Sequence, residues 1–159
     1  MAEPLIALIA DAIEAALAAI SIDGGYAIDV PTVTRPVRRG IDELPTTYGI
    51  IVTAEGGSPD EQHSPPGNPP TAARRQQFKC LMILRPVPAA TESFDALGFR
   101  GLSAMAEALM ADPQWGGLAI DTRLGETAMV SAEDGSFDGV ELTFEVIYRT
   151  SEQDWTSQQ

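Results

Sequence analysis

The chain has 159 residues, and its 23 acidic side chains against 10 Lys and Arg give a formal net charge of −13. A field of that sign repels phosphates and anionic lipids, which argues against a conventional nucleic-acid-binding protein. The length fits one domain with one core, which we place at residues 1–150, followed by a polar tail at 151–159.

The charge is uneven along the chain. Residues 1–34 carry −5, residues 35–85 carry +2 and residues 86–159 carry −10. Cys80 is the single cysteine, which excludes an intramolecular disulfide and a cysteine cluster for zinc. Because the N-terminal apolar stretch lacks a basic region and is interrupted by acids, we expect neither a signal peptide nor a membrane span, and a soluble protein made in the cytoplasm.

Apolar residues at helical spacing predict a first helix over residues 4–20. Residues 26–30 alternate and predict a strand, whereas the two prolines of 31–37 favour an edge strand or an extended crossing. We expect a loop over 37–46 and a strand over 48–55.

Residues 56–73 contain five prolines, three glycines and no large apolar side chain. Such a segment cannot bury enough surface to offset its ordering entropy, so we expect an exposed loop. Strand patterns on both sides, at 48–55 and 74–85, make this loop the long tip of a β-hairpin. Long irregular loops in compact domains are usually functional or disordered.

The second half of the chain predicts a helix and further strands. The strand at 74–85 is apolar on both faces toward its end, as in a central strand covered by a helix. A helix follows over 93–111, with Gly98 and Gly101 weakening its first half. Two shorter strands, 118–124 and 127–132, joined by Gly125-Glu126, precede the closing strand.

The closing strand alternates cleanly, with Val140, Leu142, Phe144, Val146 and Tyr148 on one face. The order of elements predicts an α+β fold, a mainly antiparallel sheet with two helices on one face and a long β-hairpin loop. A doubly wound fold would need regular alternation of strands and helices.

The sequence offers little for catalysis. His63, the single histidine, lies in the proline-rich loop, which we expect to be too mobile for a triad or a metal site. Cys80 lies among apolar strand positions, where a thiol is inert packing. Glu141 and Glu145 are separated by roughly 13 Å along a strand, farther than the about 5 to 9.5 Å that glycosidases need. We therefore expect no enzyme, no cofactor and no metal.

The arginines beside the two long loops have two interpretations. They are solvated charge that balances an acidic protein, or a basic face that meets an acidic face of a neighbouring subunit. Trp155, in the polar tail, either folds back on its own sheet or anchors into a partner. The candidate interface residues are Arg35, Arg38, Arg39, Arg74, Arg75, Arg149 and Trp155.

Several short motifs occur together along nearly the whole chain. An amphipathic N-terminal helix is followed by V-T-R-P at 33–36, R-R-Q-Q-F at 74–78, D-P-Q-W-G-G-L at 112–118, and V-I-Y-R-T at 146–150 before S-E-Q-D. This layout resembles the tail terminator (tail completion, minor tail) proteins of long-tailed bacteriophages and gene transfer agents. Two features depart from that pattern: Trp155 stands where a proline often follows the aspartate, and the 56–73 loop is unusually rich in proline.

The resemblance implies an α+β virion subunit that forms a homohexameric ring at the tail-neck junction. Such a ring caps the tail tube, ends its polymerisation and joins the tail to the neck and head. The implied partners are copies of the chain, the tail tube protein and the neck or stopper protein, with no membrane. Assembly would take place in the host cytoplasm.

DNA would then be only non-specific cargo passing through the ring. An acidic wall repels phosphates and lets the duplex slide. The candidates for the lumen or ring surface are Asp121, Glu126, Glu133, Asp134, Glu141 and Glu145. The alternatives are another head-tail connector, such as a stopper or neck protein, and a small soluble enzyme or ligand-binding α+β domain.

Overall fold

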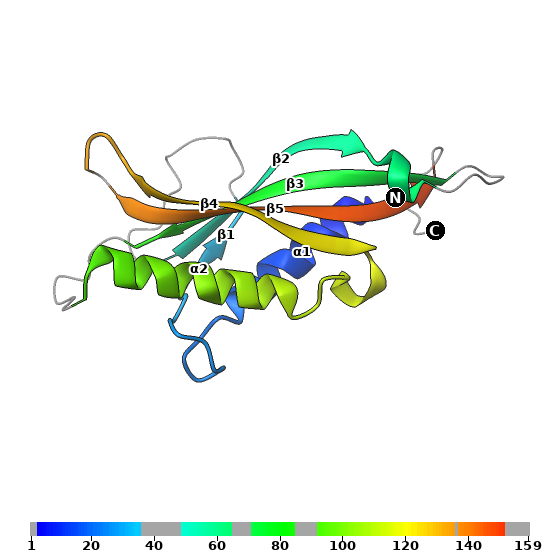
Figure 1. Ribbon diagram of the computed structural model, residues 1–159. Coiled ribbons are helices and arrows are strands. Elements are labelled where there is room, and N and C mark those ends of the chain that lie inside the picture. The colour runs from blue at the N-terminus through cyan, green and yellow to red at the C-terminus, as the bar shows by residue number, and fades with distance from the viewer. Residues whose placement is uncertain (1–2, 36–48, 65–70, 85–91, 136, 152–159) are drawn as a thin grey trace.

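The computed structural model describes residues 3–35, 49–64, 71–84, 92–135 and 137–151. The described chain is α+β: a five-stranded mixed sheet with two helices, α1 (Leu5–Ala18) and α2 (Phe94–Met110). In Figure 1 both helices lie on the same side of the sheet, and α2 runs along its length. The strands are β1 (Val33–Thr34), β2 (Gly49–Pro59), β3 (Thr71–Ile83), β4 (Asp121–Ser131) and β5 (Asp138–Ser151).

The strand order in the sheet is β1-β2-β3-β5-β4. Only the short pair β1 and β2 is parallel, and the other three pairs are antiparallel. The predicted hairpin of β2 and β3 is therefore present. Val33 and Thr34, within the segment expected to be an edge strand or an extended crossing, form the edge strand β1. The closing strand β5 inserts between β3 and β4, which makes it a central strand.

The helices cover the face of the sheet that carries the apolar row of β5. All five of its predicted inward residues, from Val140 to Tyr148, are buried. They join Phe78, whose ring stacks on that of Phe144 with centroids 5.4 Å apart, in one core cluster with residues of α1 and α2. We call this the inner face and the opposite side the outer face.

The two glycines of α2 allow the helix to approach the sheet. A Cβ added at Gly101 would lie 2.6 Å from Sδ of Met82, and one at Gly98 would lie 2.9 Å from Met129 and 3.0 Å from Val140. Both glycines are buried, and the helix spans the predicted range without interruption. The close packing that these glycines permit thus offsets the free-energy cost of placing glycine inside a helix.

Three predicted strands differ from the structure. Residues 26–30 form no strand, because the amide of Ile22 donates to Asp29 and that of Val30 donates to the carbonyl of Ile20, which folds the segment back beside the end of α1. The strands predicted at 118–124 and 127–132 are parts of one strand, β4 (Asp121–Ser131), whose register with β5 shifts between Leu124 and Thr127. The predicted Gly125-Glu126 turn is a β-bulge.

The long hairpin loop is not confirmed. Strand β2 continues to Pro59 and β3 begins at Thr71, so both strands extend into the segment expected to be a loop. A short 3-10 helix, Glu61–His63, follows β2. Residues 65–70 lie outside the described residues.

Candidate interaction surface

Charged side chains of neighbouring strands pair across the outer face of the sheet. Arg75 of β3 lies 3.5 Å from Glu145 of β5, and Lys79 lies 3.3 Å from Glu141. Asp121, on β4, pairs with Arg123 of the same strand at 3.2 Å. Three of the candidate acidic residues therefore have basic partners in the same subunit.

The remaining acidic candidates lie on or beside β4. Glu126 is exposed in the bulge, and Glu133 and Asp134 are exposed in the turn that joins β4 to β5. The backbone of Glu126 is held by Thr143, whose hydroxyl accepts from the Glu126 amide at 2.8 Å and donates to the Glu126 carbonyl at 3.2 Å.

The candidate arginines are spread over several elements. Arg35, just after β1, pairs with Asp11 and with Glu14 of α1, the latter at 2.7 Å. Arg74 lies opposite Tyr148 in the sheet. Arg149 donates from Nε to the carbonyl of His63 at 3.1 Å. Arg38, Arg39 and Trp155 lie outside the described residues.

Residues 60–64, which we call the cap segment, fold onto the outer face beside the start of β3. The Asp60 amide donates to the carbonyl of Ala73 at 2.8 Å, and the Ala73 amide donates to Ser64 Oγ at 2.9 Å. The Asp60 side chain is only 1% exposed. Its carboxylate contacts Arg75 Nε at 3.2 Å and His63 Nδ1 at 2.7 Å.

The electrostatics of the cap segment favour the ionised carboxylate. Burial alone would raise the pKa of Asp60, but the hydrogen bonds from Arg75 and His63 outweigh it, and the pKa lies below its ordinary value. The same contact raises the pKa of Arg75. His63, which was expected in an irregular loop, instead ends a short 3-10 helix, and its Nδ1 lies 2.7 Å from the Asp60 carboxylate.

Within the part of the chain that the structure describes, no free nucleophile is placed beside this histidine. In a triad the oriented imidazole faces a serine or cysteine nucleophile. The hydroxyl of Ser64 is engaged by the backbone of Asp60 and Ala73. Cys80 is fully buried in the core, and burial raises the pKa of its thiol. Among the described residues, no group of three or more His, Cys, Asp or Glu side chains is placed to hold a metal ion.

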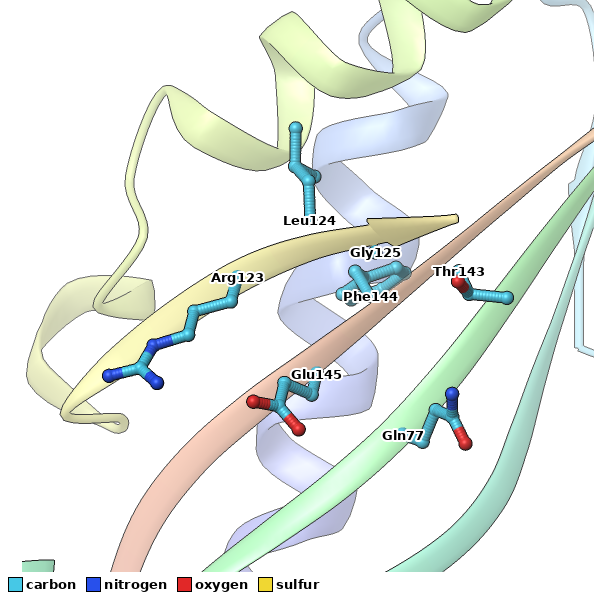
Figure 2. Close-up of a pocket in the computed structure, with 7 residues that line it drawn as sticks. All are labelled: Gln77, Arg123, Leu124, Gly125, Thr143, Phe144 and Glu145. Atoms are coloured by element: carbon cyan, nitrogen blue, oxygen red, sulfur yellow. The ribbon is translucent and has the colours of Figure 1, made fainter. Parts of the chain in front are cut away.

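A shallow depression of about 250 Å³ lies at the bulge of β4 (Figure 2). Gln77, Arg123 and Glu145 lie around it, and Leu124 points toward α2. Ligand pockets typically have volumes of about 300–1,000 Å³ and are mostly apolar. This depression is smaller, and its lining is a nearly even mixture of polar and apolar surface, so we interpret it as a consequence of the bulge.

Large apolar side chains are exposed on α2 and on the neighbouring edge strand. Of the six in the described chain, four lie on these two elements and form what we call the apolar strip: Phe99 at 65%, Met110 at 41%, Leu124 at 40% and Met129 at 38% exposed. Phe99 and Met110 share one flank of α2, because eleven residues at about 100° each return almost to the same direction. The outer backbone edge of β4 has no partner strand in the described sheet.

The sequence analysis missed Asp60 and the apolar strip. Asp60 follows a proline and precedes Glu61-Gln62, which is a helix-capping pattern, and its carboxylate accepts from the Gln62 amide. The strip carries no comparable signal, because Phe99 and Met110 were assigned no role and Leu124 was placed in a separate strand. In the described part of the chain, neither helix is long and apolar enough to cross a membrane.

Comparison of the chain with models of protein families and with curated proteins finds no match.

Proposed function

We propose that the protein is a structural subunit of the tail terminator kind, which assembles with copies of itself into a ring at the end of a phage or gene-transfer-agent tail. The apolar strip is the observation that supports the proposal. Its four large apolar side chains lie on α2 and on β4, an edge strand of the described sheet, and association would bury them. The α+β fold, with two helices on one face of a mainly antiparallel sheet, agrees with the fold that the resemblance implies.

In this proposal the ring ends polymerisation of the tail tube and joins it to the neck, while DNA passes through. The acids of β4 and its following turn, Glu126, Glu133 and Asp134, are exposed and are the best candidates for the wall. Carboxylates at a channel wall repel phosphates and keep the duplex mobile. Virion components of this kind act by contact and not by chemistry.

The test is the oligomeric state and the binding of tail tubes. Native mass spectrometry and negative-stain electron microscopy of the purified protein should give rings, and the protein should cap isolated tail tubes. A protein that stays monomeric at high concentration and with tail tubes present would refute the proposal.

A pair of variants locates the contact. Phe99→Asp should abolish ring formation, because it places a charge in the strip. Ile22→Asp is the matched control, since Ile22 is a similarly exposed apolar side chain, at 59%, outside α2 and β4. Equal loss in both variants, or loss in the control alone, would show that the strip is not the contact.

A further inference from the structure

We propose that the cap segment, residues 60–64, is a flap locked onto the sheet by the Asp60 carboxylate, and that neutralising this carboxylate opens the flap while the sheet and helices stay folded. The device is independent of the ring. The proposal is based on the bonds that the Asp60 carboxylate makes to the sheet and to the segment, and on the strand pairing that remains when those bonds are lost.

The carboxylate is the hub of the attachment. It accepts from Arg75 of β3, from His63 and from the backbone amide of Gln62, and its side chain is 1% exposed. Hydrogen bonds to ionised groups are roughly twice as strong as neutral ones, so neutralising the carboxylate weakens all of these bonds together. The titratable and charged groups around this hub are His63 in the segment, Arg75 on β3, and Glu145 and Arg149 on β5.

When the flap opens, few polar groups are left without a hydrogen-bond partner or access to water. Arg75 still has Glu145 at 3.5 Å, and its side chain is 31% exposed and open to water. The other attachments of the segment are the donation from the Asp60 amide to the Ala73 carbonyl, from the Ala73 amide to Ser64 Oγ, and from Arg149 Nε to the His63 carbonyl. Strand β3 keeps its ladder with β5 over residues 71–75. Detachment is therefore local.

The flap lies at one end of the outer face, where β5 also ends (Figure 1). Ala73, an outer-face residue whose amide and carbonyl are both bonded to the flap, is 1% exposed. On opening, the Ala73 backbone and methyl group join the charged outer face. The same sheet therefore presents two different surfaces, depending on the charge of one carboxylate.

The test is amide hydrogen exchange, followed by NMR, in the full chain. In Asp60→Asn the backbone amides at position 60 and at Ala73 should exchange about 10- to 100-fold faster than in the wild type, whereas those of Leu142 and Phe144 should be unchanged. Asp121→Asn is the matched control, because Asp121 is also paired with an arginine but lies on β4. It should leave the two reporter amides unchanged.

Unchanged exchange at positions 60 and 73 in a folded Asp60→Asn protein would overturn the proposal. Loss of protection at Leu142 and Phe144 as well would also overturn it, because Asp60 would then support the whole fold. Arg75→Gln supplies a second test that removes the cation instead of the anion. It should accelerate the same two amides, and no acceleration there would count against the lock.

Discussion

The glycines of α2 allow the packing of the helix on the sheet to be tested quantitatively. Replacing glycine by alanine inside a helix gains about 1 kcal/mol of intrinsic propensity. At Gly101 the new methyl would lie 2.6 Å from Sδ of Met82, a side chain that is 1% exposed and belongs to the core cluster. Overpacking of this kind costs about 1–3 kcal/mol, so we expect Gly101→Ala to destabilise the protein by about 1 kcal/mol net.

Gly98 should respond differently. The methyl there would meet the end of Met129, which is 38% exposed and can swing away, although Val140 at 3.0 Å must still yield slightly. Gly98→Ala should therefore be close to neutral. Urea unfolding at 25 °C, followed by circular dichroism, measures the difference, and Ser103→Ala on the exposed face of α2 reports the propensity effect alone. If Gly101→Ala is as stable as Gly98→Ala, the close-approach argument is wrong.

Three further predictions concern acidity, the turn after α2 and salt. Because the pKa of Asp60 is lowered on folding, its carboxylate stabilises the folded state above the ordinary pKa of 3.8, and this stabilisation is lost as the pH falls through the lower folded pKa. The Ala73 amide should therefore lose protection from hydrogen exchange in that pH range. In Asp60→Asn this pH dependence should be absent. Trp115→Phe should lower the free energy of unfolding in urea by about 1 kcal/mol, because the indole donates to Thr122 Oγ1 at 2.8 Å. Thr122→Val should lower it further, since this hydroxyl also donates to the carbonyl of Pro113. If the apolar strip drives association, sedimentation at about 50 and 500 mM salt should show equal or stronger association at high salt, because salt screens the repulsion between acidic copies. Weaker association at high salt would instead favour an interface of matching basic and acidic faces.

The helices and the central strands could be predicted because their residues repeat with the period of burial. The inward row of β5 is apolar at every second position, and the apolar positions of α1 fall on one side of a helix. Such patterns depend only on which face is covered, and so they are visible before the neighbours are known. The α+β class followed from the order of these elements.

The bulge of β4 could not be predicted, because Gly125-Glu126 has the composition of a turn. Its conformation is set by Thr143 on the neighbouring strand, whose hydroxyl pairs with both backbone groups of Glu126. Similarly, the composition of 56–73 predicted an exposed loop. The cap segment is ordered by Arg75, which is distant in sequence and binds Asp60 from β3. Local patterns carry no information on either contact.

The pairing of the charged candidates changes which surface is expected to drive association. Arg35 and Arg75 already have acidic partners in their own subunit, so a neighbouring acid would have to replace these partners. Pairs exposed to solvent contribute only about 0–1 kcal/mol, and exchanging one for another gains little. Burying apolar surface gains about 25 cal/mol for each Å², and Phe99 alone is 65% exposed. In the proposed ring, the charges would therefore set the register between copies, and the apolar strip would supply the free energy of association.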